Sequence, residues 1–135
     1  MKGIHFFVVG MMVFLMSCND DSTSTTVNEN FNSPVTTNVV NSFTYSVNAN
    51  KYSANSHTAL SFLSDSLVVT LASSGYSSGQ VIISVKDSLN GTIFVDTVTS
   101  NKTIAITDLK TTKPKYCNLD VTNLTAKLAF VIVGQ

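Results

Sequence analysis

The chain has 135 residues and a net charge of zero, with eight lysines, no arginine and eight acidic residues. This length is enough for one domain and leaves little room for a second. The balanced charge argues against nucleic-acid binding, which needs a basic surface, and the missing arginine removes the usual bidentate clamp for phosphate or carboxylate groups.

The N-terminal segment, residues 4–16, is apolar apart from His5 and Gly10 and follows Lys2. As a helix, this run would extend about 20 Å, which is shorter than the roughly 30 Å hydrocarbon core of a bilayer. We therefore interpret residues 1–17 as a signal peptide that is absent from the mature protein.

Four residues end this apolar run: Leu15, Met16, Ser17 and Cys18. Their pattern resembles the lipobox of bacterial lipoproteins. The resemblance implies that Cys18 receives a diacylglyceryl group and becomes the new N-terminus after cleavage. Acyl chains contribute about 0.8 kcal/mol per buried methylene, so they would anchor the chain to a membrane. The alternative is an ordinary secretory peptide with an incidental cysteine.

An acidic stretch, Asn19, Asp20 and Asp21, comes directly after the cysteine. It resembles the export signal on surface lipoproteins of Bacteroidota-type bacteria. The resemblance implies a lipid-anchored protein of the outer membrane that faces the cell exterior. The alternative is that the two aspartates begin a solvated linker, in which case the domain could face the periplasm.

Residues 18–41 are mostly Asn, Asp, Ser, Thr and Val, with few large apolar side chains. Such a segment buries too little apolar surface to offset the entropy of ordering it, so we predict a flexible tether after the lipidated cysteine. An edge strand at residues 35–40 is the alternative for its last part.

Residues 42–135 alternate between apolar and polar residues over short runs, which predicts half-buried β-strands. We see no apolar stripe of helical period. About eight such strands predict an all-β fold, a small antiparallel two-sheet sandwich. The positions predicted to face the core are Leu67, Val69, Leu71, Val81, Ile83, Val85, Ile104, Ile106, Cys117, Leu119, Val121, Leu128, Phe130 and Ile132.

Turn residues separate these runs at residues 48–50, 73–79 and 87–91. The last group contains Asn90-Gly91, which is the strongest short hairpin signal. Together with the apolar residues 92–94 and the closing segment 123–130, it resembles small immunoglobulin-like or jelly-roll-like domains of exported Bacteroidota-type proteins. Such domains are mostly of unknown function, so the resemblance implies a fold and no activity.

Residues 75–79, Gly-Tyr-Ser-Ser-Gly, match the G-x-S-x-G pattern of serine hydrolases. A nucleophile elbow needs a strand before it, a helix after it and a catalytic histidine later in the chain. Here a strand is predicted to follow, and His57, the only histidine of the mature chain, comes earlier. We therefore predict a hairpin loop and no enzyme; a small hydrolase that uses Ser77 is an alternative.

The sequence predicts neither a metal site nor a cofactor. His57 has no second histidine and no cysteine or glutamate at metal-ligand spacing, and we place it in or beside a turn between Asn55 and Thr58. The turn at residues 87–91 lacks the alternating oxygen ligands of a calcium loop.

Cys117 shares its predicted face with Leu119 and Val121. We interpret it as a small buried hydrophobic residue. A reactive thiol would need an electropositive, exposed setting, and Lys115 nearby keeps that alternative open.

Tyr116, Asn118 and Asp120 alternate with these core positions, so we expect them to point outward. A tyrosine beside an amide and a carboxylate offers ring stacking and directional hydrogen bonds, which favours binding of a sugar. Tyr76, in a predicted loop, could add a second stacking platform.

The hypothesis we favour is a membrane-anchored lipoprotein whose β domain is a non-catalytic binding or structural module. Its partners would be the membrane, through the lipid anchor, and a glycan or protein ligand. One alternative is a carbohydrate-binding module, and another is an envelope assembly subunit that pairs with a partner through an edge strand.

Overall fold

The computed structural model describes residues 30–135, which form six β-strands and no helix. The all-β prediction is confirmed. Within the described residues there is accordingly no helix long and apolar enough to cross a membrane. The signal peptide, Cys18 and the acidic stretch at Asn19, Asp20 and Asp21 lie outside the described residues. The strands are β1 (Val35–Val39), β2 (Ser42–Ala59), β3 (Ser66–Lys86), β4 (Thr92–Val98), β5 (Lys102–Lys110) and β6 (Tyr116–Gly134).

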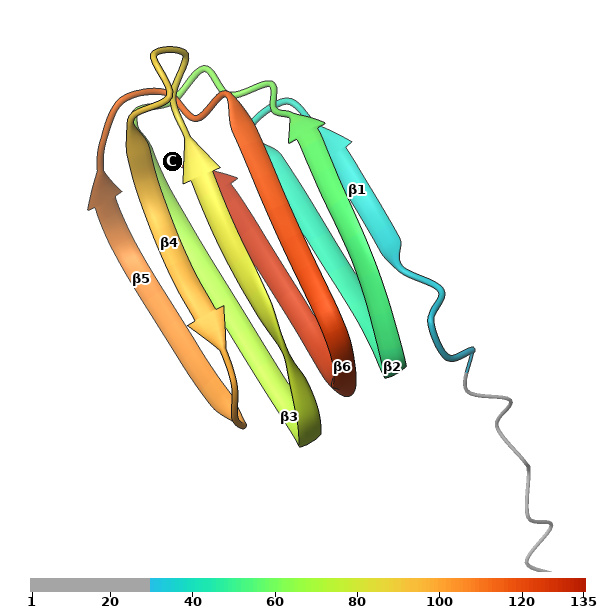
Figure 1. The fold of residues 1–135 in the computed structure, drawn as a ribbon. Helices are drawn as coiled ribbons and strands as arrows, with labels where there is room; N and C mark the ends of the chain where they lie inside the picture. The colour runs from blue at the N-terminus through green and yellow to red at the C-terminus, as the bar shows by residue number, and fades with distance from the viewer. Residues whose placement is uncertain (1–29) are drawn as a thin grey trace, which may run out of the picture.

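All strand pairs are antiparallel and belong to one hydrogen-bonded sheet (Figure 1). The order is β1-β2-β6-β3-β4, and β5 also pairs with β3. β6 therefore lies at the centre, between β2 and β3 over nearly its whole length.

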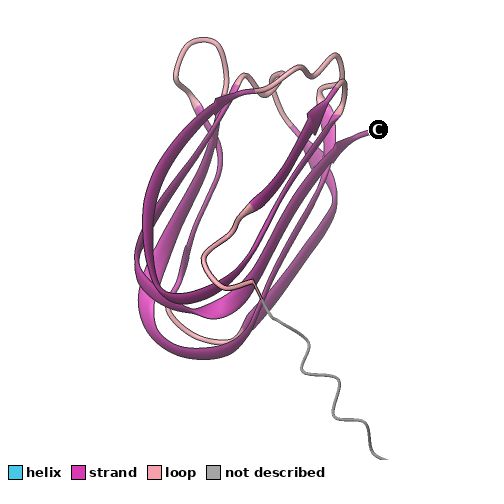
Figure 2. Cartoon of the chain, turned by 90° about the vertical axis from the view of Figure 1, so that its right-hand side faces the viewer, coloured by secondary structure: helices cyan, strands magenta, loops and turns pink. Residues whose placement is uncertain are grey.

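Three long strands bend back on themselves, so that the sheet folds into two facing layers (Figure 2). Register shifts mark the bends, at residues 49–54 of β2 and 74–80 of β3. Positive φ angles occur there at Lys51, Gly75, Gly79 and Asn123. A bulge of this kind adds a residue to one strand and increases its local bending.

The first layer contains β1, β5 and residues 42–49, 66–73 and 126–134 of the long strands. The second layer contains β4 and residues 52–59, 81–86 and 116–121. We call the end with the three bends the bend end. The opposite, loop end carries the connections at residues 40–41, 60–65, 87–91 and 111–115 (Figure 1).

The core lies between the two layers and is formed by alternate residues of every long strand. Phe130 is fully buried, and its ring contacts Phe43 in its own layer and Phe94 in the other, with centroids 6.4 and 5.7 Å apart. Of the predicted inward positions, Ile104 and Ile106 are partly buried and pack against the core, and all the others are buried.

The strand count and the sandwich detail differ from the prediction. We expected about eight strands in two sheets; the structure has six in a single sheet. Residues 48–50 and 73–79 were predicted to be turns, but they are bends through which β2 and β3 continue. An immunoglobulin-like sandwich consists of two separate sheets, so that resemblance is not confirmed.

Residues 87–91 form the hairpin turn that the sequence predicts. Asn90 has a φ of 62°, and the Asp87 carboxylate accepts hydrogen bonds from the amides of Leu89 and Gly91 at 2.8 and 2.7 Å. The Thr112 hydroxyl donates to the other carboxylate oxygen at 2.9 Å, which ties this turn to the β5–β6 connection.

Part of the predicted tether is a strand. Residues 35–39 form β1, as in the edge-strand alternative. Asn32 fixes its start at the bend end. The Asn32 side chain donates to Asn50 O at 3.0 Å and accepts from Asn50 N at 2.8 Å, as a backbone neighbour would. The chain therefore enters the domain at the bend end.

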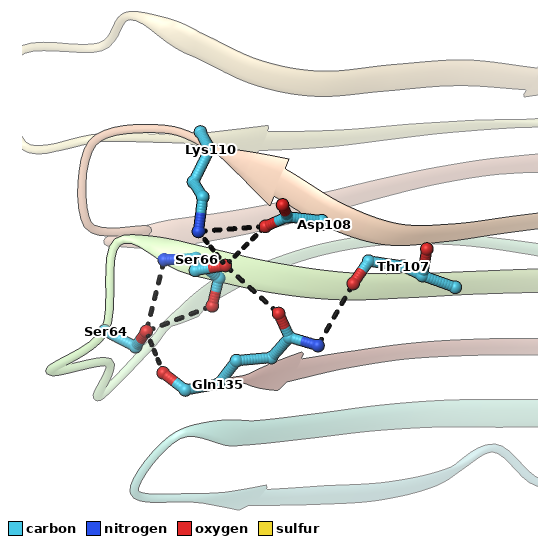
Figure 3. A network of polar contacts seen from close by, with 6 residues as sticks. All are labelled: Ser64, Ser66, Thr107, Asp108, Lys110 and Gln135. Atoms are coloured by element: carbon cyan, nitrogen blue, oxygen red, sulfur yellow. Dashed lines mark hydrogen bonds and ion pairs between the residues drawn. The ribbon is translucent and has the colours of Figure 1, made fainter.

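A polar network closes the loop end of the first layer (Figure 3). The Ser66 hydroxyl lies 2.9 Å from Asp108 Oδ1 and 3.1 Å from Gln135 Oε1, and it accepts a hydrogen bond from Lys110 Nζ at 3.2 Å. Hydrogen bonds from Lys110 and Ser66 hold the pKa of Asp108 below its usual value. Because the Ser66 hydroxyl is buried among these partners, we interpret the network as structural.

Candidate functional site

The outer surface of the second layer gathers most of the residues that the sequence singled out. Tyr116, Asn118 and Asp120 alternate along β6 with the buried Cys117, Leu119 and Val121, so they face away from the core as predicted. The neighbouring strands add outward residues in register with them. We call this surface the His57 face; it consists of His57, Ser84, Lys86, Tyr116, Asn118 and Asp120.

Two aromatic rings stack on this face. Tyr116 pairs across the strands with Ala59, and Asn118 pairs with His57, so His57 and Tyr116 are diagonal neighbours on the same side of the sheet. Their ring centroids are 5.0 Å apart and the ring planes differ by 25°. The contact restrains both side chains and presents a continuous aromatic surface at the loop end of the layer.

A row of hydrogen bonds crosses three strands beside these rings. Asn118 lies between His57 of β2 and Ser84 of β3, its partners in the sheet register. Its amide nitrogen donates to Ser84 Oγ at 3.3 Å, and its amide oxygen contacts His57 Nδ1. Because that oxygen can only accept, Nδ1 carries a proton, and in the neutral ring Nε2 is left as an acceptor.

Charged side chains flank this row on either side. Lys86 of β3 pairs in register with Tyr116, and the exposed Asp120 pairs with Ile82. Neither Lys86 nor Asp120 forms an ion pair within residues 30–135. The His57 face therefore offers an aromatic surface, hydroxyl and amide groups, an imidazole acceptor and both signs of charge.

A hollow of about 410 Å³ adjoins the face at the loop end. It lies next to Tyr116, because Lys115 precedes that residue and Leu60 follows Ala59, its partner in β2. The loops around it are linked by a hydrogen bond from Leu60 N to Lys115 O at 2.8 Å. Apolar side chains, two serines and two lysines line it: Leu60, Ser61, Phe62, Leu63, Ser88, Lys113, Pro114 and Lys115.

No family model matches the chain, and neither a curated protein nor a solved structure resembles it closely enough to match.

Tyr76 does not join the His57 face. It lies in the bend of β3, where its hydroxyl donates to Gly79 O at 2.8 Å and its amide donates to Asn101 Oδ1 at 2.8 Å. From there to Lys86, the partner of Tyr116, β3 extends for roughly 30 Å. The two tyrosines therefore lie at opposite ends of the domain and cannot hold one small ligand together.

Sequence reasoning missed three residues of this face: His57, Ser84 and Lys86. We predicted a turn between Asn55 and Thr58, but these residues lie within β2. The polar run around His57 resembles a turn in composition, and its outward side chain alternates with half-buried serine and threonine rather than with large apolar residues. The weak apolar signal of this part of β2 explains the wrong prediction.

The G-x-S-x-G motif at residues 75–79 has an explanation in the backbone. Gly75 and Gly79 have φ angles of 63° and 85°, and β3 continues through the motif without a following helix. Ser84 lies in the same row of the sheet as His57, and Ser77 is roughly 20 Å further along β3. Ser77 is therefore far from the histidine that a serine hydrolase would need. These two glycines therefore serve the bend of the strand.

The remaining candidate groups are spread over the domain. Cys117 is fully buried between Thr58 and Val85 in the sheet register, as predicted, and burial raises the pKa of its thiol to about 12. Within residues 30–135, no three His, Cys, Asp or Glu side chains come together as metal ligands would.

Proposed function

We propose that this protein is a membrane-anchored lipoprotein whose β domain is a non-catalytic binding module for glycans, with the His57 face as the binding surface. The observation that carries the proposal is the stacked pair His57 and Tyr116 beside the hydrogen-bonded row through Asn118 to Ser84. Aromatic rings pack against the apolar face of a sugar, and fixed amides and hydroxyls bond its hydroxyl groups.

The rigidity of this face supports the proposal. Its side chains stand on the central strand and its two neighbours, and four of them, His57, Ser84, Tyr116 and Asn118, are each restrained by a contact to another. A preorganised surface loses little side-chain entropy when a ligand binds, which favours affinity from few contacts. The adjoining hollow with Lys113 and Lys115 extends the surface towards the loop end, where an acidic substituent would be favoured.

A glycan array followed by calorimetric titration tests the binding function. We expect Tyr116→Ala and Asn118→Ala each to weaken the best ligand by about tenfold or more, which corresponds to about 1.4 kcal/mol. Thr70→Ala, on the outer surface of the first layer, is the matched control and should leave the affinity unchanged. A glycan that binds all three variants equally, or the absence of any glycan ligand, would refute this use of the face.

The anchor is tested separately, on whole cells. We propose that Cys18 carries the lipid and that Asp20 and Asp21 direct the protein to the cell surface. Intact mass should show the lipid on the wild type and not on Cys18→Ala. External protease should digest the wild type and spare the Asp20→Ala/Asp21→Ala variant. If both forms are spared, the domain faces the periplasm and its ligands are envelope components.

A further inference from the structure

The two layers differ in width on the side where β2 lies. In the first layer, β1 covers β2 over its residues 42–46. In the second layer, residues 52–59 of β2 pair only with β6, so β2 forms the edge there. We call residues 52–59 the open edge. The second layer is therefore one strand narrower than the first on this side, and β1 extends beyond it (Figure 1).

Side-chain amides occupy the two ends of this edge and leave its middle free. Asn32 bonds both backbone groups of Asn50 just before the open edge, and Asn38 Nδ2 donates to Ala59 O at 2.8 Å at its far end. Between them, the backbone groups of residues 52–58 that face away from β6 have no partner within residues 30–135. Such a row of unpaired donors and acceptors is a template for another strand.

The edges at β4 and β5 carry features that prevent strand addition, and the open edge does not. On β4, Lys102 pairs with Asp96 at 2.8 Å and also donates to Thr97 O. β5 carries the charged residues Asp108 and Lys110, and a register shift interrupts its pairing with β3. The open edge has neither acidic residues nor lysines, and no proline.

The overhang of β1 limits what can pair here. If a second folded copy of the chain added its edge strand here, it would bring its whole two-layered sheet with it. The other layer of that copy would then clash with β1. A single extended segment fits, because it needs only the width of one strand, about 4.8 Å. Its inward side chains would lie between two pairs of uncharged, accessible residues. Thr36 and Asn38 of β1 form one pair, and Ser56 and Thr58 of β2 form the other.

We propose that the open edge binds one extended peptide segment of a partner protein, of about seven residues, as an additional antiparallel strand. Main-chain hydrogen bonds supply the affinity, and the uncharged lining selects small inward residues such as Ser, Thr, Ala and Val. The proposal is independent of glycan binding, since the His57 face lies on the outer surface of the layer and the peptide would lie at its edge.

The test uses the full chain and peptides from a displayed heptapeptide library of Ser, Thr, Ala, Val and Asn. A selected peptide, labelled with fluorescein, is titrated against the variants Ser56→Lys and Asn55→Lys. These neighbouring residues face opposite sides of the strand, so lysine enters the peptide site only at position 56. We expect at least about tenfold weaker binding for Ser56→Lys and less than about twofold for Asn55→Lys.

Two further measurements keep the outcome clear. Thr36→Lys places the charge on β1 and leaves β2 unchanged. It should weaken peptide binding as Ser56→Lys does, and it provides the test if Ser56→Lys folds poorly. Thr37→Lys, on the outer face of β1, is the control for Thr36→Lys. Amide hydrogen exchange should slow at residues 52–58 when the peptide binds. A library that yields no binder, equal loss with all four variants, or protection elsewhere in the sheet would overturn the proposal.

Discussion

Cys117 is fully buried in the second layer, which determines its reactivity. Because burial raises the pKa of the thiol to about 12, the thiol is protonated at pH 8 and is also inaccessible to reagents. In a Cys18→Ala variant, where Cys117 is the one thiol left in the sequence, we expect no reaction with a disulfide reagent such as DTNB in the native protein and one equivalent of reaction after unfolding in guanidinium. Rapid reaction of the native protein at this thiol would contradict the observed burial.

Asp87 makes the β3–β4 turn sensitive to pH. Hydrogen bonds from the Thr112 hydroxyl and from the amides of Gly91 and Leu89 lower the pKa of its carboxyl group. Because the pKa is lower in the folded state, the ionised Asp87 carboxylate stabilises the fold above about pH 4, the ordinary pKa of the group. This stabilisation is lost as the pH falls through the lowered pKa.

The matched substitution follows from these contacts. Asp87→Asn removes the oxygen that accepts from Thr112, so its melting temperature at pH 7 should be lower than that of the wild type. The difference should shrink as the pH falls below 4 and the wild-type carboxylate becomes protonated. Asp65→Asn serves as the control, because the Asp65 carboxylate accepts no hydrogen bond within residues 30–135. An Asp87→Asn difference that is constant between pH 7 and pH 3 would contradict this role.

At the scale of the strand, the bends depend on glycine in two distinguishable ways. Gly75 and Gly79 both have positive φ angles, but a Cβ atom on Gly79 would lie 2.3 Å from Asn123 O, whereas one on Gly75 would meet nothing within 4 Å. Gly75→Ala should therefore cost only the left-handed strain of about 1–2 kcal/mol. Gly79→Ala should cost clearly more, since it also forces β3 and β6 apart. Urea denaturation of both variants measures the difference, and equal losses would contradict the close packing of the two bends.

The bends also show what the sequence could not predict. Asn and Gly are favoured in hairpin turns and in bulges alike, so residues 48–50 and 73–79 were reasonable turn predictions. Whether the chain reverses or continues depends on β6, a partner distant in sequence. One signal was present: core residues are odd-numbered from Cys117 to Val121 and even-numbered from Leu124 to Ile132, a change that a bulge within a single strand explains.

The sequence predicted that the site residues of β6 point outward, but not which residues of the other strands join them. Strict alternation around Cys117 was enough to place Tyr116, Asn118 and Asp120 on the outer surface. His57 and Ser84 join them only through the register of β2 and β3 with β6, which no local pattern determines. The same long-range pairing separates Tyr76 from Tyr116.

For the whole molecule, the continuity of the long strands predicts that both layers unfold together. Phe130 contacts a ring in each layer, and Phe130→Ala should reduce the free energy of unfolding by about 3–5 kcal/mol. Since β2, β3 and β6 belong to both layers, hydrogen exchange should accelerate in β4 and β5 alike. Val95→Ala, at a side chain that is 59% exposed, is the control and should have little effect. Two separate transitions in Phe130→Ala would contradict a single cooperative unit.

The entry of the chain at the bend end has a mechanical consequence. β1 begins there, beside Asn32, and runs towards the loop end along β2. If the N-terminal side is held by a lipid while a ligand is held near Tyr116, tension acts along the strands. The hydrogen bonds between β1 and β2 would then be sheared together rather than broken one after another. A domain attached in this direction resists detachment by flow better than one whose first strand is peeled from its end.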